Sequence, residues 1–309
     1  MKFSETTRIK DIMEAKEFKP FGKFLFPEGY IHPSPSMTVE DLGRLMPWHT
    51  EIRKEKTLEV LRYMDRKVSD GEKIFFDIYS REEKEVDPSK KDTGLFFFRG
   101  EKGAPTAILS PGGGFVYVGA MQDSFPLALS LSAKGINALS LQYRTGSAHA
   151  ACEDLARAIS FLFAKREELS IEMGGYSLWG ASAGARMAAC LGAFGPAAFN
   201  EKVSDKPAAV ILQSTGYAEA GPADAPAFAC VGDLDGIADW RIMAERTRRL
   251  GQYGIPADIH VYHGLRHGFG LGEGTPAEGW EEEALRFWQA RRKAKFQEHS
   301  EFYRKKKAL

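Results

Sequence analysis

Short apolar runs and longer helical segments alternate along this chain from about residue 73 to the end. Such alternation is typical of a mostly parallel sheet, because each parallel connection needs a crossover helix that packs on one face of the sheet. The expected fold class is therefore α/β, with an eight-stranded sheet and helices on both faces. The expected strands are Ile74–Ser80, Leu95–Phe98, Thr106–Ser110, Ala138–Gln142, Tyr176–Trp179, Ala209–Gln213, Ala227–Val231 and Asp258–Tyr262. The expected helices are Gln122–Ala133, Ala150–Leu169, Ala183–Ala193, Ala238–Tyr253 and Pro276–Lys295.

The first two expected strands have no helix between them. Only the polar stretch Arg81–Thr93 separates them, which is too hydrophilic for a crossover helix packed on a sheet. These two strands are therefore expected to form an antiparallel hairpin that leads into the parallel part of the sheet.

The first seventy residues differ from the alternating part. Aromatic residues and prolines crowd residues 18–35, which are too apolar for a free tail. Residues 38–46 begin with a threonine, a typical N-cap, and predict a short helix, and a second helix is expected over residues 50–68. The chain is therefore divided into an N-terminal segment, residues 1–70, which packs on or caps the main domain, and an α/β main domain, residues 71–309.

The connection between the strands that end at residue 213 and begin at residue 227 is too short to contain a lid. Only about a dozen residues separate the two strands. Any cover over a site at this edge of the sheet must therefore come largely from the N-terminal segment. The sequence leaves open whether that segment covers its own site or that of a second copy, and so whether the chain forms a homo-oligomer.

Charge and cysteine content exclude several classes of function. Lys plus Arg and Asp plus Glu both number 42, and this net charge of +0 argues against nucleic acid or an anionic membrane as the main partner. Cys152, Cys190 and Cys230 lie far apart and outside any C-x-x-C spacing, which argues against a disulfide framework or a zinc knuckle. The sequence contains neither a signal-type stretch nor an apolar run of membrane-spanning length, so a cytoplasmic protein is expected.

The pentapeptide Gly180–Gly184 places Ser182 between two glycines in the spacing G-x-S-x-G. An apolar strand precedes the pentapeptide and a helix of small residues follows it. In this setting the glycines keep side-chain volume away from a strained turn, so the serine hydroxyl is exposed at a helix N-terminus. The pattern alone is weak, since composition produces it in roughly one such chain in five. It predicts a catalytic nucleophile if the chain also supplies a base and an acid.

A serine hydroxyl needs a base to accept its proton and an acid to orient that base. His267 follows the last expected strand on a glycine-flanked loop, and Asp235 directly follows the strand before it. All three residues fall at the carboxyl ends of strands, where ligands bind to open α/β sheets. Their order along the chain, serine, acid and histidine, is that of the α/β-hydrolases. Asp233 is the alternative acid because it lies only two residues away, whereas Asp239 is expected to cap the next helix.

A glycine loop, Gly112–Gly114, follows the third expected strand. It can place unhindered backbone amides beside the serine, as the stabilisation of an oxyanion requires. The amides of Gly113, Gly114 and Ala183 are expected to bind that oxyanion. A loop for a nucleotide phosphate is the alternative, but the dinucleotide pattern needs a third glycine where Tyr117 stands, and no Walker lysine is present.

Neither a metal nor a cofactor is expected. His260 and His263 precede His267, but they fall on opposite faces of the last strand and do not form a ligand cluster. Acyl transfer through a serine needs no cofactor. The pocket for the acyl group or the alcohol is expected to be lined by Phe115, Tyr117 and Phe269.

Two arginines near the expected site have structural interpretations. Arg144 follows a strand and either braces neighbouring loops or faces the substrate, and bracing is favoured. Arg186 lies one turn into the helix after Ser182 and is expected to be a structural ion-pair partner.

Together these motifs resemble the α/β-hydrolase esterases and, more narrowly, the hormone-sensitive-lipase-like branch of bacterial acetylesterases and carboxylesterases. The resemblance covers roughly residues 73–295 and rests on Gly112–Phe115, Tyr143-Arg144, Gly180–Gly184, Asp235 and His267–Phe269. It implies a catalytic triad of Ser182, Asp235 and His267, with an oxyanion hole formed by the amides of Gly113, Gly114 and Ala183. In that family a histidine usually precedes the triple glycine. Here Pro111 stands in its place, so the loop must be held without that side chain.

We therefore interpret the chain as a serine carboxylester hydrolase that acts on small-molecule esters through an acyl-enzyme. Acetyl-type esters of sugars or other small alcohols are favoured, because no lid of the kind used by long-chain lipases is inserted. Two alternatives stay open. One is an amidase or peptidase on the same triad, arylformamidase-like or prolyl-oligopeptidase-like, and the other is a non-enzymatic binding protein on a hydrolase scaffold.

Overall fold

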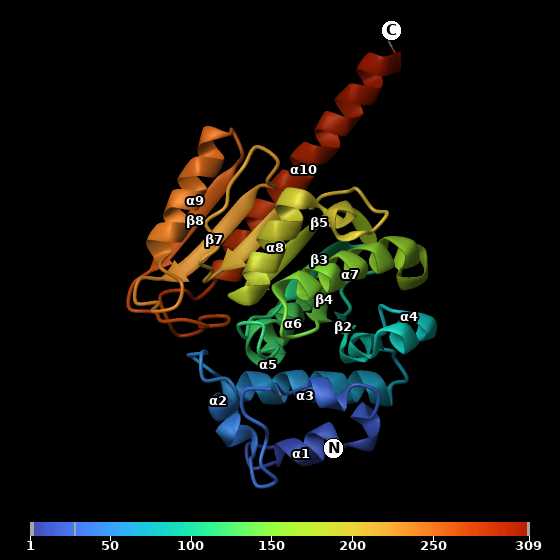
Figure 1. Ribbon diagram of the computed structural model, residues 1–309, viewed down its shortest axis with the longest axis vertical. Coiled ribbons are helices and arrows are strands. Elements are labelled where there is room, and N and C mark those ends of the chain that lie inside the picture. The colour runs from blue at the N-terminus through green and yellow to red at the C-terminus, as the bar shows by residue number, and fades with distance from the viewer. Residues whose placement is uncertain (1–2, 28, 308–309) are drawn as a thin grey trace.

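The computed structural model describes residues 3–27 and 29–307, with side chains as far as residue 297. It contains an eight-stranded sheet in the order β1-β2-β4-β3-β5-β6-β7-β8. The strands are β1 (Phe75–Phe76), β2 (Gly94–Phe98), β3 (Pro105–Ser110), β4 (Asn137–Gln142), β5 (Glu172–Ala181), β6 (Ala209–Gln213), β7 (Ala227–Gly232) and β8 (Ala257–Tyr262). Each lies at an apolar run that predicts it, although β1 is shorter than expected. The α/β fold class is confirmed (Figure 1).

Strand pairing brings the carboxyl ends of the central strands to one edge. β2 pairs antiparallel with β1, as the expected hairpin requires, and antiparallel with β4, while the other neighbours are parallel. The register aligns Ser110 of β3 with Gly180 of β5, and Ala181 of β5 with Gln213 of β6. The loops that follow these strands therefore meet at the same edge of the sheet.

Helices cover both faces of this sheet. α8 lies in front of the strands in Figure 1 and α10 passes behind them. The helices of the main part are α4 (Arg81–Val86), α5 (Ala120–Asp123), α6 (Phe125–Ala133), α7 (Ala148–Leu169), α8 (Ala183–Phe194), α9 (Trp240–Gln252) and α10 (Trp280–Lys307), with 3₁₀ turns at Pro88–Asp92 and Pro196–Phe199. Among the described residues, no helix is both long enough and apolar enough to cross a membrane.

Two helical regions differ from the sequence-based expectation. The helix expected over residues 122–133 is divided at Ser124, because Pro126 in the first turn of α6 lacks the N–H that a continuous helix would need. The connection between β1 and β2 was expected to be irregular but contains α4. There Ser80 and Glu83 form a capping box, in which each side chain accepts the backbone N–H of the other and so starts the helix.

The N-terminal segment consists of short helical pieces. They are α1 (Ile9–Met13), α2 (Leu42–Leu45) and α3 (Lys54–Ser69), with 3₁₀ turns at Lys16–Phe18, Gly22–Phe24 and Val39–Asp41. The expected helix over residues 38–46 is thus a 3₁₀ turn followed by the single turn of α2. The second expected helix begins at residue 54 rather than 50, and residues 46–53 form an irregular connection.

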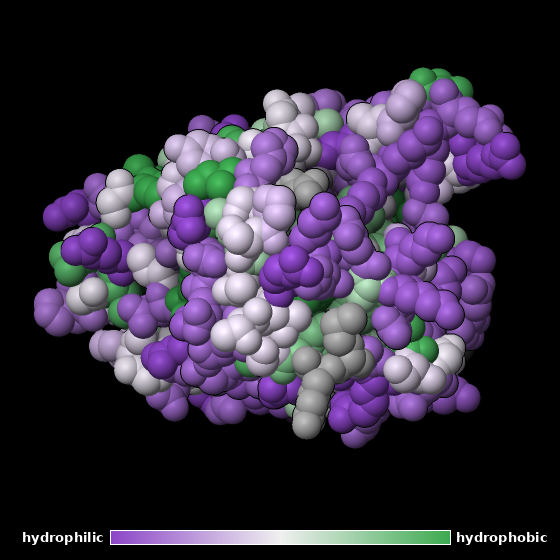
Figure 2. Space-filling model, turned by 90° about the horizontal axis from the view of Figure 1, so that it is seen from below, coloured by the Kyte–Doolittle hydropathy of each residue, from purple (hydrophilic) through white to green (hydrophobic). Residues whose placement is uncertain are grey.

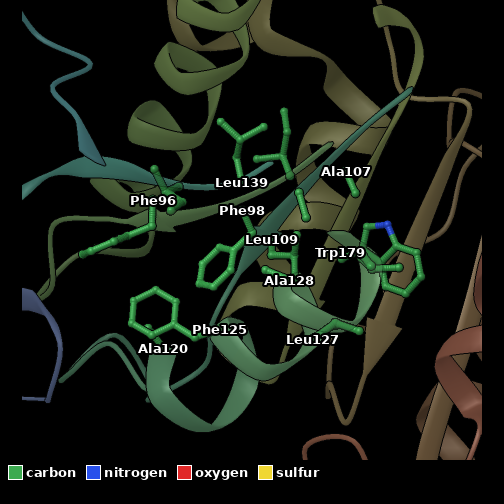
Figure 3. Packing of buried hydrophobic residues seen from close by; sticks show 14 of the residues in the cluster. Phe96, Phe98, Ala107, Leu109, Ala120, Phe125, Leu127, Ala128, Leu139 and Trp179 are labelled. Carbon is green, nitrogen blue, oxygen red and sulfur yellow. The ribbon is translucent and has the colours of Figure 1, made fainter. Parts of the chain in front are cut away.

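Aromatic side chains join the N-terminal segment to the sheet. The Phe21 ring lies 5.8 Å from that of Phe75 and 5.4 Å from that of Phe96. On α6, Phe125 packs against Phe96 and Phe98 (Figure 3). Burying side chains of this size contributes about 1.5–3 kcal/mol each. The surface on the N-terminal side is mostly hydrophilic (Figure 2), so the apolar side chains of the segment are directed inward and one core continues across residue 70.

Candidate active site

Ser182 lies at the tight turn between β5 and α8. Its backbone has φ 52° and ψ −115°, a conformation that residues other than glycine rarely adopt. The flanking glycines allow this turn, since a Cβ on Gly180 would lie 2.3 Å from the Gly184 carbonyl carbon, and one on Gly184 would lie 1.9 Å from the Ser110 carbonyl oxygen. Although Ser182 is the N-cap of α8, its side chain does not cap that helix. The hydroxyl is therefore available to another partner.

That partner is His267, which lies on the loop after β8. The Ser182 Oγ is 2.9 Å from His267 Nε2. On the other side of the ring, His267 Nδ1 is 2.9 Å and 2.8 Å from the two carboxylate oxygens of Asp235, on the loop after β7. The Asp235 side chain is 0% exposed and that of His267 is 7% exposed. The structure thus brings the three residues expected from the sequence into one hydrogen-bonded chain.

The surroundings of Asp235 keep its carboxylate ionised. Burial by itself raises the pKa of Asp235, but the hydrogen bond from His267 and those from the amides of Ala238 and Ile237 lower it further than burial raises it. These amides donate to Asp235 Oδ1 at 2.8 Å and 2.9 Å. The result is a pKa below the usual range of an aspartate, so Asp235 carries a negative charge beside the imidazole at neutral pH.

The two other aspartates considered from the sequence have different partners. Asp233 Oδ2 lies 2.7 Å from His263 Nδ1, on a histidine that is exposed to solvent. Asp239 accepts the Arg241 amide at 2.9 Å and caps α9. Among the carboxylates that the structure describes, Asp235 is the one bonded to His267.

The glycine loop lies directly beside Ser182. A Cβ on Gly112 would be 3.0 Å from the Ser182 Cβ, and Gly113 and Gly114 have φ angles of 121° and 61° that favour glycine. Within the described ranges, no acceptor takes the amide hydrogens of Gly113, Gly114 or Ala183. Free amides beside a hydroxyl can stabilise a negative charge that develops on a neighbouring oxygen.

Other residues hold this loop in spite of Pro111. The Tyr143 hydroxyl donates to the Pro111 carbonyl oxygen at 2.9 Å, and the Gly112 amide donates to Asp123 Oδ2 at 2.7 Å. The same Asp123 oxygen lies 2.9 Å from His49 Nε2. Neither Asp123 nor His49 stands out in the sequence, because the first lies within an expected helix and the second between two expected helices, outside any motif.

A groove of about 470 Å³ opens at Ser182. The residues around it include Gly114, Phe115, Arg186, Tyr217 and Ile237. Of the three aromatics expected to line a pocket, Phe115 lies here. Tyr117 and Phe269 are instead fully buried away from the groove. Among the described residues of the N-terminal segment, none lines this groove.

The two arginines have different roles in the structure. Arg144 braces loops, as favoured from the sequence, since it binds Asp154 through Nε at 2.9 Å and Asp87 through Nη1 at 3.2 Å. Arg186 was expected to be an ion-pair partner, and this expectation was wrong for the described residues. Its side chain is exposed and lines the groove, and none of the ion pairs formed by described residues includes it.

Comparison with known proteins gives one family match and several similar structures. Residues 98–247 match the model of the BD-FAE family. The chain is similar in structure to an acetyl ester-xyloside bifunctional hydrolase from Caldicellulosiruptor lactoaceticus, at 19% identity and TM-score 0.62, over 70% of this chain and 95% of that one. It is also similar to a propionate-bound esterase from Thermogutta terrifontis, at 17% identity and TM-score 0.55, over 63% and 88% of the two chains. No curated protein sequence matches the chain.

A third similar structure is MGS-M1, an α/β hydrolase from a Medee basin deep-sea metagenome library, with 19% identity and TM-score 0.59 over 71% of this chain and 97% of that one. Likeness at such low identity is evidence of a shared fold. The narrower resemblance to the hormone-sensitive-lipase-like branch is not confirmed by these matches. The chain therefore has the α/β-hydrolase fold, and its central part, residues 98–247, matches the BD-FAE family.

Proposed function

We propose that this protein is a serine carboxylester hydrolase. The observation that carries the proposal is the chain of hydrogen bonds from Ser182 through His267 to Asp235, at 2.9 Å and 2.8 Å, beside three free amides. A hydroxyl bonded to an imidazole whose other nitrogen contacts a buried carboxylate is the arrangement that activates a serine for acyl transfer. The BD-FAE match and the esterases among the similar structures support the same reaction class.

Each residue has a defined role in this reaction. Ser182 Oγ attacks the ester carbonyl carbon while its proton passes to His267 Nε2. The carbonyl oxygen becomes an oxyanion that accepts hydrogen bonds from the amides of Gly113, Gly114 and Ala183. His267 then gives the proton to the alcohol oxygen, the C–O bond breaks and the alcohol leaves. Water attacks the acyl-enzyme with His267 as base, which releases the acid and restores the serine hydroxyl.

Asp235 acts through the ring nitrogen of His267 that does not contact Ser182. Its carboxylate accepts a hydrogen bond from the Nδ1–H group of His267, which fixes the tautomer in which Nε2 can receive the serine proton. It also stabilises the imidazolium that forms during attack, because its charge is buried and close.

The substrates that fit best are short-chain, acetyl-type esters of small alcohols or sugars. The groove at Ser182 is open and about 470 Å³ in volume, which suits a small ester better than a long acyl chain. Among the similar structures, one is described as an acetyl ester-xyloside hydrolase and another was determined with propionate bound. These descriptions support short acyl groups here.

A substrate panel tests the proposal. Aryl acetate and propionate should be hydrolysed with a kcat/KM at least about tenfold above that for octanoate, and acetylated sugars should be hydrolysed as well. Matched anilides should be poor substrates. Faster cleavage of the anilides would favour an amidase, and a chain that neither turns over any ester nor reacts with a fluorophosphonate would be a binding protein.

Replacement of Asp235 by asparagine should lower kcat on aryl acetate by about 10³- to 10⁴-fold, because the amide cannot hold His267 in the required tautomer. The matched control is Asp233→Asn, since Asp233 lies two residues away and contacts the exposed His263 instead. The control should keep kcat within about threefold of the wild type. Equal losses in the two variants would contradict the assignment of Asp235. The measurement is steady-state kinetics at pH 7–8.

Replacement of Asp235 by asparagine should also change how the free energy of unfolding depends on pH in the acid range. Because the folded-state pKa of Asp235 is lowered, its contribution to folding is present above the unfolded pKa of about 3.9 and is lost as pH falls through the lowered value. The difference in free energy of unfolding between wild type and Asp235→Asn should therefore shrink below about pH 4. Urea unfolding at a series of pH values measures this difference.

A further inference from the structure

The connection between α2 and α3 reaches the candidate active site from the N-terminal segment. Figure 1 shows this connection rising toward the loop that follows β8. Thr50 donates from its amide to the Gly268 carbonyl oxygen at 3.1 Å and from its hydroxyl to the His267 carbonyl oxygen at 2.8 Å. Trp48 packs against the glycine loop, since a Cβ on Gly114 would lie 2.9 Å from its ring. Residues 48–50, called the strap below, thus contact both halves of the site.

The strap places a buried histidine behind the glycine loop. The His49 side chain is 3% exposed and that of Asp123 is 1% exposed, with Nε2 and Oδ2 2.9 Å apart. Asp123 Oδ2 also accepts the Gly112 amide at 2.7 Å, whereas Oδ1 has no hydrogen-bond partner among the described residues. A buried carboxylate needs compensating donors, and His49 is the side chain that supplies one here.

The second ring nitrogen of His49 binds the other end of the same loop. Nδ1 lies 3.1 Å from the Tyr117 hydroxyl. Because the Asp123 carboxylate can only accept a hydrogen bond, the proton of a neutral His49 lies on Nε2, and Nδ1 accepts a hydrogen bond from the Tyr117 hydroxyl. The Tyr117 amide in turn donates to the Gly113 carbonyl oxygen at 3.1 Å.

These contacts form one network around Gly113 and Gly114 of the glycine loop. Gly112 precedes Gly113 and Gly114, and Tyr117 follows them. His49 is linked to Gly112 through Asp123, and to Tyr117 directly. Pro111, which precedes this loop, has no side-chain hydrogen-bond donor that could hold it.

We propose that His49 is a positioning residue of the esterase reaction: from the N-terminal segment, it fixes both ends of the glycine loop so that the amides of Gly113 and Gly114 point at the developing oxyanion. The proposal rests on the proposed function, because it assumes that the loop binds an oxyanion. An oxyanion donor acts only if it is held in place before the reaction, and the loss of one such donor costs about 10²- to 10³-fold in kcat. A substitution that only makes the glycine loop more mobile, and leaves its amides in place, should lower kcat by a smaller factor.

The experiment compares His49→Phe and His49→Gln with the wild type. The first removes both hydrogen bonds and keeps a ring, and the second keeps an amide donor that can reach Asp123. On aryl acetate, His49→Phe should lower kcat by about 10- to 100-fold with KM within about threefold, and His49→Gln should fall between it and the wild type. The matched control is His32→Phe, at an exposed histidine of the same segment, which should retain wild-type kinetics.

A transition-state analogue separates positioning from a merely structural role. An aryl trifluoromethyl ketone forms a reversible hemiketal with Ser182 whose oxygen occupies the oxyanion position. Its inhibition constant should rise in His49→Phe by the same factor as kcat/KM falls, while inhibition by the product alcohol should change by less than about twofold. A lowered melting temperature with full kcat and unchanged ketone binding would overturn the proposal and make His49 a structural residue.

Two further arms keep the outcome decisive. If His49→Phe does not fold, Tyr117→Phe removes a single oxygen from the same network and should lower kcat by about 3- to 10-fold, with a parallel loss of ketone affinity. An unchanged kcat in that variant would overturn the proposal. A wild-type protein that neither hydrolyses esters nor binds the ketone would contradict the proposed function itself. An active wild type whose His49 variants are equally active would contradict only the role of His49.

Discussion

Replacement of Ser182 by alanine should lower kcat on aryl acetate by at least about 10⁴-fold, the largest loss that we expect for any single substitution in this chain. The change removes only the Oγ, which lies 2.9 Å from His267 Nε2 and does not cap α8. The fold should therefore be retained, because no helix cap and no core contact is lost. The measurement is steady-state kinetics together with mass spectrometry of the protein after reaction with a fluorophosphonate.

The control for this variant is a second serine. Ser130 lies on α6, where its hydroxyl accepts a hydrogen bond from Lys134 on the surface. Ser130→Ala should keep full activity and should still be labelled by the fluorophosphonate at the peptide that contains Ser182. Activity that survives in Ser182→Ala, or a label on another residue, would mean that the nucleophile lies elsewhere.

Replacement of Gly184 by alanine should destabilise the protein by about 3 kcal/mol or more, and it can prevent folding altogether. A Cβ at this position would lie 1.9 Å from the Ser110 carbonyl oxygen and 2.7 Å from that of Pro111. Both are backbone atoms at the end of β3, so the clash cannot be relieved by a side-chain rotation. The added methyl group must push α8 away from the sheet, or push the glycine loop away from Ser182.

Gly251→Ala is the matched control. Gly251 lies in α9, and a Cβ there would meet no atom within 4 Å. Since alanine favours a helix over glycine, this change should stabilise the protein by up to about 1 kcal/mol. Urea unfolding of both variants measures the difference in the free energy of unfolding. Similar values for the two would show that α8 does not approach the sheet as closely as described.

Features that depend on neighbouring residues were predicted well from the sequence. β6, for example, is a run of five apolar or amide residues that are all buried, and its length and its flanks mark it as an interior strand. The turn at Ser182 is marked by two glycines that the close approach of α8 and β3 requires. Asp235 and His267 could be proposed because strand ends were predicted accurately enough to place both at one edge of the sheet.

Features that depend on contacts between distant residues could not be predicted. His49 binds Tyr117 and Asp123 across 68 and 74 positions, and the segment around it contains no motif. Tyr117 was expected in the substrate pocket because it follows the glycine loop. Its ring instead stacks on Trp48 at a centroid distance of 5.2 Å, a contact that only the folded N-terminal segment provides. The burial of a side chain depends on what packs over it, and local patterns do not contain that information.

The bonds that Thr50 makes to the His267 loop have a consequence for how the protein becomes active as it folds. The Thr50 hydroxyl and the His267 carbonyl oxygen are 217 positions apart, so their bond can form only after β8 has joined the sheet and the N-terminal segment has docked. A molecule with a complete sheet but an undocked segment would retain most of its secondary structure and yet lack a fixed histidine loop. We therefore expect that esterase activity requires the docked N-terminal segment as well as the complete sheet, so that activity reports on the assembly of the whole chain.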